Sequence, residues 1–153
     1  MIELPTYELA QKNKYYSLNI KDILNSYFSE SKIYGAKCDK CDREEVYSKT
    51  SIYKLAENLI IYFGITANDE YISNKIDYNE KLDLTDYLYE IKKSNNYSLD
   101  CVIEHSRSSE FGYYSALCQI KTGSWYYFSD SFYHSNDSYF ESNNAIILLY
   151  NAC

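Results

Sequence analysis

Two cysteines separated by two residues form the first candidate site of the chain. Cys38 and Cys41 lie in the segment KCDKC. Two thiolates at this spacing can bind one zinc ion from the same side, but a closed structural zinc site needs four ligands. The sequence has no second pair at this spacing. The pair therefore predicts half of a zinc site, occupied only where other ligands are supplied, or a remnant of such a site. A thioredoxin-type redox role fits less well, because that motif follows a strand and begins a helix.

Cys101 and His105 are the second candidate pair, as a nucleophile and its general base. Both lie in an alternating segment that predicts a strand, where four residues separate two Cα atoms by roughly 13 Å. A nucleophile and its base must lie about 3 Å apart. The pair is therefore predicted to be a buried thiol and a structural histidine. His134 lies in the polar segment SFYHSNDS, predicted to be an exposed loop, and Asp130 is either a catalytic carboxylate or a turn residue.

The segments around these residues predict an α+β fold in which strands dominate. Residues 17–28 carry apolar side chains at helical spacing and predict a short helix, capped by Ser17 or Asn19. Residues 32–55 predict a strand, a tight cysteine turn and a second strand, and the apolar run 59–65 predicts a buried strand. Residues 81–91 fit either a strand or a short helix. Four more strands are predicted, at 97–106, 112–121, 124–131 and 145–152. Short strands joined by polar turns predict a mainly antiparallel sheet, with Trp125 as a core anchor.

The composition bounds the class of protein. The chain has 153 residues, about the length of one domain, and a net charge of −7. An acidic chain is a poor binder of duplex nucleic acid, which attracts a basic face, and it favours a basic partner. No apolar run approaches the roughly 20 residues that span a bilayer, and residues 1–14 lack the apolar core of a signal peptide. The five cysteines are read as reduced thiols, which predicts a cytoplasmic or nuclear protein.

Taken in order, these segments resemble the C-terminal half of the ubiquitin-specific protease family, the papain-like deubiquitinases. The family pattern is roughly Y-x-L-x-x-V-I-x-H-S-G, G-H-Y-x-A, W-x-x-F-[ND]-D-S and an apolar A-Y-x-L-x-Y ending. This chain has YSLDCVIEHS at 97–106, GYYSA at 112–116, WYYFSDS at 125–131 and AIILLY at 145–150. The match extends from about residue 17 to residue 151. It implies a partial cysteine-proteinase fold with a palm-like sheet and a short zinc-knuckle-like finger segment.

The departures from the family pattern fall on the chemistry. Tyr113 stands where the family has its general-base histidine, and a tyrosine, which titrates near pH 10, cannot take a thiol proton at neutral pH. Ser129 stands where the family has the Asp or Asn that orients the histidine, and Asp130 keeps the family's following aspartate. The family's cysteine box has no counterpart before residue 17. The first CxxC of the family's finger segment is also missing, which leaves Cys38 and Cys41 as half of a metal site.

The resemblance implies one truncated domain over residues 1–153, with a partial finger segment at about 1–55 and a palm at about 56–153. Its implied partner is ubiquitin or a ubiquitin-like protein, together with a protein subunit over the side that normally faces the missing helical thumb. No nucleic acid and no membrane are expected as partners. The resemblance and the departures together predict a non-catalytic binding or scaffold module. The alternative is the C-terminal fragment of a thiol-dependent deubiquitinase, active only with a missing N-terminal part.

Overall fold

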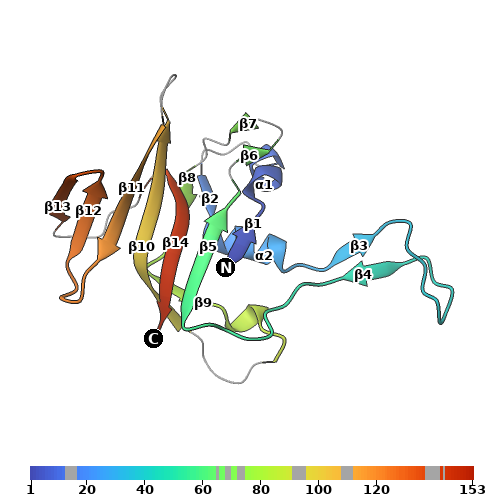
Figure 1. Cartoon of the computed structure of the whole chain (residues 1–153). Helices are drawn as coiled ribbons and strands as arrows, with labels where there is room; N and C mark the ends of the chain where they lie inside the picture. Colours follow the sequence, from blue (N-terminus) through green and yellow to red (C-terminus); the bar gives the residue numbers. More distant parts are fainter. Residues whose placement is uncertain are drawn as a thin grey trace.

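The computed structural model describes residues 1–12, 17–64, 66–67, 70–71, 75–90, 96–107, 112–136, 142 and 144–153. In this described part, an eight-stranded sheet dominates the molecule (Figure 1). Its strands run in the spatial order β1-β5-β14-β10-β11-β12-β13, and β9 pairs with β10 outside this path. The members are β1 (Ile2–Leu4), β5 (Asn58–Phe63), β9 (Lys81–Asp83), β10 (Asn96–Arg107), β11 (Gly112–Gln119), β12 (Trp125–Ser129), β13 (Phe132–Asn136) and β14 (Ala145–Ala152).

The sheet is antiparallel except at one edge, where β1 pairs in parallel with β5. The predicted α+β fold with a mainly antiparallel sheet is therefore confirmed. Small elements surround the sheet: α1 (Thr6–Lys12), β2 (Ser17–Asn19), α2 (Ile20–Tyr27), β3 (Ser31–Ile33), β4 (Val46–Ser48), β6 (Thr66–Ala67), β7 (Glu70–Tyr71), β8 (Lys75–Asp77) and the 3-10 helix η1 (Thr85–Tyr87). None of the described helices has the length and apolar character needed to cross a membrane.

The core lies between one face of the sheet and helix α2. Ile20, Ile23 and Leu24 of α2 are fully buried. The predicted helix begins at Ile20 rather than at residue 17, because residues 17–19 pair with β8 as strand β2. Asn19 caps the helix, as one of the two predicted capping residues: its side-chain oxygen accepts a hydrogen bond from the Lys21 backbone N–H at 2.9 Å.

Strand β5 shows that only one face of the sheet is covered by the core. Leu59, Ile61 and Phe63 are buried, whereas Ile60 is 36% exposed. The apolar run 59–65 predicted a buried strand, and β5 is buried on its core face only. Trp125 is buried, as predicted.

A two-stranded hairpin, β3 with β4, projects away from the sheet (Figure 1). The cysteine turn lies between its strands, as predicted for residues 32–55. The predicted finger segment, about residues 1–55, also contains β1, which pairs with β5 at the edge of the palm-like sheet. Residues 81–91 combine both predicted alternatives, with strand β9 followed by η1.

The segment around His134 differs from its prediction. It forms strand β13, which pairs with β12, and His134 lies opposite Tyr127. The polar residues of this segment suggested a loop, but an edge strand tolerates polar side chains because both its faces can remain in water. The predicted exposure of His134 is confirmed.

Buried tyrosine hydroxyls connect the sheet to the loops beneath it. Tyr150 is fully buried and donates a hydrogen bond to the Asn79 carbonyl oxygen at 2.7 Å. Burial, with a smaller contribution from nearby Tyr78, raises the pKa of Tyr150 above its ordinary value of 10.0. The fold therefore favours the protonated form of this side chain. The stabilisation is fully present below pH 10 and is lost as the pH rises through the folded-state pKa.

The substitution Tyr150→Phe should lower the free energy of unfolding at pH 7 by about 1–2 kcal/mol, because the Asn79 carbonyl loses its partner. It should also weaken the decline in stability above pH 10. Urea unfolding followed by circular dichroism at pH 7 and at pH 10.5 measures both effects. The matched control is Tyr34→Phe, at a side chain that is 87% exposed. Equal effects of the two substitutions would contradict this role for Tyr150.

Candidate functional site

The two positions that the resemblance aligns with the family's histidine and its orienting residue lie on neighbouring strands. Tyr113 is near the start of β11, and Ser129 is the last residue of β12. In the register of these strands, Leu117 faces Tyr127. Side chains two residues apart share a face of a sheet, so Tyr113 and Ser129 both lie on the face of Leu117, which is the core face. Extending the register by one step places Ser129 diagonally from Tyr113, about 7–8 Å away and within reach of a long side chain.

Asp130 lies in the turn between β12 and β13 and is exposed. Its φ angle is +50°, in the left-handed region that aspartate tolerates better than most residues. Of the two predicted roles of Asp130, this φ angle supports that of a turn residue. The Asp130 carboxylate belongs to the residue that directly follows Ser129.

A buried polar pair lies next to Tyr113, and it was missed in the sequence. The Ser115 hydroxyl donates a hydrogen bond to the Glu104 carboxylate at 2.7 Å, and both residues are less than a tenth exposed. Ser106, directly opposite Tyr113, accepts a hydrogen bond from the Asn144 side-chain amide at 3.2 Å. The sequence alternation had set Glu104 on the polar face, opposite Leu99 and Ile103, so the burial of Glu104 was not predicted. The cluster supplies hydrogen-bonding groups but no nucleophile.

Cys101 and His105 do not form a catalytic pair. Both lie in β10, as predicted, and each contacts a different partner on β11. The His105 ring stacks on Tyr114 with ring centroids 4.4 Å apart. It also lies over Gly112, where an added Cβ would meet the His105 Nε2 atom at 2.7 Å. Cys101 lies opposite Cys118. Five residues separate Cys101 from the position opposite Tyr113, or about 16 Å along the strand.

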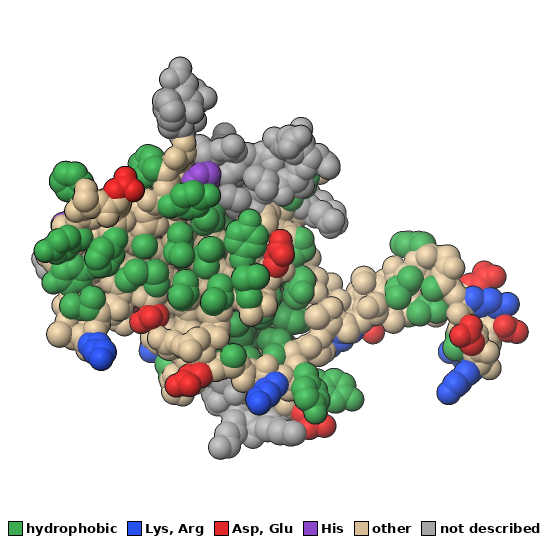
Figure 2. All heavy atoms as spheres, viewed as in Figure 1, with side chains coloured by type: hydrophobic (Ala, Val, Ile, Leu, Met, Phe, Trp, Pro, Cys, Tyr) green, Lys and Arg blue, Asp and Glu red, His purple; other side chains and the backbone are tan. Residues whose placement is uncertain are grey.

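The face of the sheet turned away from the core is apolar over its whole width, and we call it the open face. Figure 2 shows hydrophobic side chains gathered across it. The register defines two rows that cross the strands. The first row contains Tyr62, Ile147, Ile103, Ala116, Phe128 and Tyr133. The second contains Ile60, Leu149, Cys101, Cys118 and Tyr126.

The open face is large enough to act as an interaction surface. Tyr114, Phe128 and Tyr133 are 62%, 40% and 70% exposed. At about 150–250 Å² for each aromatic side chain, these three alone expose about 250–430 Å². Monomeric proteins rarely expose contiguous apolar patches above a few hundred Å², and larger ones mark sites of contact with other molecules. Glu3, opposite Tyr62, places an acidic group at one end of the first row.

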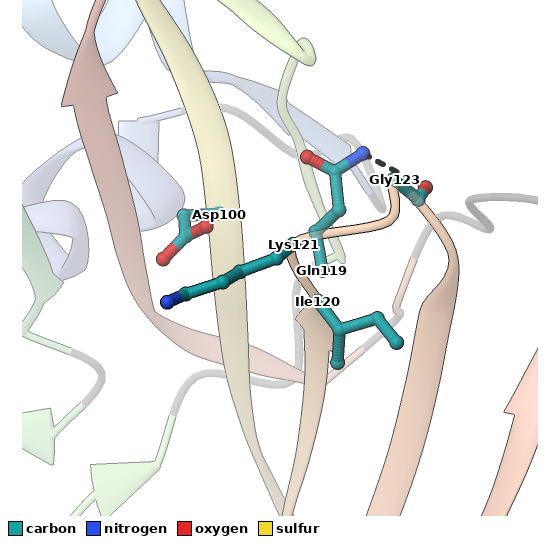
Figure 3. Close-up of a pocket in the computed structure, with 5 residues that line it drawn as sticks. All are labelled: Asp100, Gln119, Ile120, Lys121 and Gly123. Carbon is teal, nitrogen blue, oxygen red and sulfur yellow. Dashed lines mark hydrogen bonds between the residues drawn. The ribbon is translucent and has the colours of Figure 1, made fainter.

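An open pocket of about 550 Å³ lies at the turn between β11 and β12, lined by Asp100, Gln119, Ile120, Lys121 and Gly123 (Figure 3). The Gln119 side-chain amide turns back onto the Gly123 carbonyl oxygen at 3.2 Å. The pocket contains one acid and one base but no nucleophile, histidine or paired carboxylates. It therefore offers charge for binding and no group for catalysis.

The cysteine turn of the finger hairpin is preformed around Cys38. The Cys38 backbone N–H donates to the Arg43 carbonyl, and the Asp42 N–H donates to the Cys38 carbonyl, both at 2.9 Å. Hydrogen bonds from the Lys40 backbone N–H and then from Cys41 lower the pKa of the Cys38 thiol. Within the described residues, no group of three or more His, Cys, Asp or Glu side chains is arranged to hold a metal ion. Cys38 and Cys41 therefore stay a predicted half-site.

Comparison with known proteins agrees with this arrangement. The family model for ubiquitin carboxyl-terminal hydrolase matches residues 8–150. The chain belongs to the ubiquitin carboxyl-terminal hydrolase family. A probable ubiquitin carboxyl-terminal hydrolase of Acanthamoeba polyphaga mimivirus is 28% identical to it over 135 residues, which cover 78% of this chain and 28% of the viral protein. The resemblance to the ubiquitin-specific proteases is thus confirmed at the level of the family.

Solved structures of family members share the fold. A chain of the yeast SAGA DUB module containing an Sgf73 mutant superposes with a TM-score of 0.76 and 23% identity, covering 90% of this chain and 34% of that one. A SAGA DUB module of Ubp8, Sgf11, Sus1 and Sgf73 bound to monoubiquitin gives a TM-score of 0.76 and 20% identity over the same shares. The chain thus spans about a third or less of the length of the relatives it matches, so their activity does not transfer to it directly.

The placement of Tyr113 and Ser129 on one face can be tested with a reporter histidine. In Tyr113→His, the new imidazole should titrate near pH 6.5. Adding Ser129→Asp should raise its pKa by roughly half a unit or more, because a carboxylate nearby on the same face favours the imidazolium. Two-dimensional NMR of the histidine side chains across pH 5–8 measures both values.

The matched control places the histidine at the next residue, which lies on the opposite face. In Tyr114→His, the same Ser129→Asp substitution should change the histidine pKa much less. Equal shifts at positions 113 and 114 would contradict the proposed arrangement of the two strands.

The half-site at Cys38 and Cys41 predicts weak metal binding. Two thiolates leave a zinc ion short of a closed set of ligands. Dialysis against EDTA should therefore leave the unfolding temperature unchanged within about 1 °C, as should the pair of substitutions Cys38→Ser and Cys41→Ser. A fall of several degrees with EDTA, reproduced by Cys38→Ser and not by Cys153→Ser, would show that zinc is a structural component.

Proposed function

We propose that this chain is a non-catalytic member of its family that binds ubiquitin or a ubiquitin-like protein. The observation that carries the proposal is Tyr113, which occupies the position of the general base on a strand that otherwise keeps the family's order. Tyrosine is not a general base for a thiol at neutral pH, because a phenol ordinarily titrates near pH 10. Ser129 adds no charge that would stabilise an imidazolium.

Without catalytic residues, the chain would act by binding another protein. The chain carries a net charge of −7, which favours encounter with a basic partner. Relatives of the same fold have been solved in complex with monoubiquitin and with ubiquitin aldehyde. The family resemblance implies ubiquitin as the partner. The tail-proximal surface of ubiquitin is basic and complements an acidic palm. Binding should be weak, because the helical thumb that forms the other wall of the family's tail cleft lies outside this match.

The open face supports a second contact, with a protein subunit. Solved modules of the same fold contain Sgf11, Sus1 and Sgf73 as further subunits. An apolar sheet face of this width costs solubility in an isolated chain, and a subunit that covers it removes that cost. A cytoplasmic or nuclear location, where ubiquitin is available, is part of the same proposal.

The alternative function is that of a C-terminal half of an active thiol-dependent deubiquitinase. It requires a nucleophilic cysteine and a general base from another polypeptide. Tyr113 argues against it, since supplying only a cysteine would still leave the base position occupied by a phenol.

Titration of the ¹⁵N-labelled chain with unlabelled ubiquitin, followed by NMR, tests the proposal. We expect fast-exchange shifts with a Kd of roughly 10 μM to 1 mM, corresponding to about −4 to −7 kcal/mol. The reciprocal titration of labelled ubiquitin should show shifts on its basic, tail-proximal surface. The affinity should fall as salt is raised from 50 to 300 mM, because charge contributes to encounter.

Absence of shifts at millimolar ubiquitin, with the chain folded, would remove ubiquitin as the partner. Binding that is insensitive to salt would remove the electrostatic part of the proposal. Lysozyme, a basic protein of unrelated fold, serves as the control for non-specific attraction to an acidic chain.

A further inference from the structure

A pair of thiols at the centre of the open face is not explained by the family or by ubiquitin binding. Cys101 of β10 and Cys118 of β11 are directly opposite each other in the register. Their sulfur atoms lie 2.7 Å apart. Both cysteines are free thiols in this structure. No local pattern indicated the pairing, because it depends on how β10 aligns with β11, and the two cysteines are 17 residues apart in the chain.

The backbone already holds the two residues at a distance that a disulfide can bridge. Directly opposed residues of an antiparallel pair have Cα atoms about 4.5–5.5 Å apart. Disulfides span Cα distances of about 4.4–6.8 Å. A bond between the two sulfur atoms therefore requires no change of register. On its other side, in β14, Cys101 lies opposite Leu149, so Cys118 is the cysteine that the register of the described strands places beside it.

The two thiols differ in accessibility and in acidity. Cys101 is 9% exposed, whereas Cys118 is partly exposed. The contact between the two thiols lowers the pKa of Cys118 and raises the pKa of Cys101, and the burial of Cys101 raises its pKa further. Nearby Asp100 acts in the opposite direction on Cys118. The more accessible thiol is thus also the one more easily converted to a thiolate, the form that reacts with oxidants.

We propose that Cys101 and Cys118 are a redox-active dithiol that hydrogen peroxide converts to a cross-strand disulfide. The Cys118 thiolate attacks one peroxide oxygen, so that an S–O bond forms, the O–O bond breaks and hydroxide leaves as water after taking a proton. The Cys101 sulfur then attacks the sulfenic acid on Cys118. The S–S bond forms, the S–O bond breaks, and hydroxide leaves with the Cys101 proton as a second water. Two thiols are oxidised and one peroxide is reduced to two waters.

The disulfide would join the two strands that carry the core-facing cluster around Tyr113. It would also replace two thiols by a disulfide in the second row of the open face, between Leu149 and Tyr126. Where glutathione keeps most thiols reduced, a disulfide of this kind is transient and reports the redox state. The inference is independent of ubiquitin binding, since it concerns the opposite face of the sheet from Tyr113.

Quantitative alkylation after oxidation tests the proposal. The reduced full chain is treated with hydrogen peroxide, denatured in acid, alkylated and analysed by intact mass and peptide mapping. Five thiols should be alkylated before oxidation and three after it, Cys38, Cys41 and Cys153. The mapped link should join the peptides of Cys101 and Cys118, with a mass loss of about 2 Da, and dithiothreitol should reverse it.

The variant with Cys38→Ser and Cys41→Ser removes the two cysteines of the finger hairpin and should still form the link between Cys101 and Cys118. In this background, Cys118→Ser should slow thiol loss about tenfold or more. Cys101→Ser should leave the first step within about twofold and leave a sulfenic acid on Cys118 that dimedone traps. Serine is close to cysteine in size, and circular dichroism of each variant checks that it is folded.

Three results would overturn the proposal. One is a wild-type chain that keeps five alkylatable thiols under peroxide that oxidises free dithiothreitol in the same solution. The second is a link that maps to other cysteines. The third is equal slowing by Cys101→Ser and Cys118→Ser of the first step, which would contradict the assignment of Cys118 as the reacting thiol.

Discussion

The alignment of β10 with its two neighbours is the constraint on which the rest of this structure depends. β10 lies between β11 and β14, and it carries polar side chains on the core face at one end and one thiol, Cys101, on the open face near its middle. Because side chains alternate between faces, a slip of one residue would move every one of them to the other side. The register thus decides at once that Tyr113 lies on the core face, that Glu104 meets Ser115, and that Cys101 meets Cys118. The register of β10 with β14 shifts between Leu99 and Cys101 and between Ile103 and Glu104. The register of β10 with β11 is continuous from Cys101 to Arg107.

The same constraint holds whichever side chains stand at positions 113 and 129. The positions of Tyr113 and Ser129 are fixed by backbone hydrogen bonds of β11 and β12, which do not depend on the side chains at these two positions. A histidine replaced by a tyrosine removes a general base but leaves the strand in place. The sheet has one face against the core, which includes α2, and one apolar open face.

Local patterns predicted the elements well where one signal dominated. The strongly apolar segment 145–152 matches β14 residue for residue, and Asn19 before the first buried isoleucine marks the start of α2. Prediction failed where pairing with another strand, rather than the local sequence, decided the secondary structure. Residues 17–19 joined β8 rather than the helix, and the polar segment around His134 became a strand because β12 offered it an edge. The assignment of Tyr113, Ser129 and Asp130 to family positions rests on motif order and stays a prediction. The Cys101–Cys118 and Glu104–Ser115 pairs could not be found, because no local pattern encodes which residues of two strands face each other.

The central claim is that the chain keeps the family's sheet without its catalysis, and a hydrolysis assay tests it most directly. The purified chain, at micromolar concentration, is incubated with ubiquitin carrying a fluorogenic amide at its C-terminus, between pH 6 and pH 9. The account predicts release at the rate of buffer alone at every pH, unchanged by Tyr113→Phe or by prior alkylation of the thiols. Release that exceeds the buffer rate and is abolished by alkylation would contradict it, and would assign a catalytic role to a cysteine of this chain.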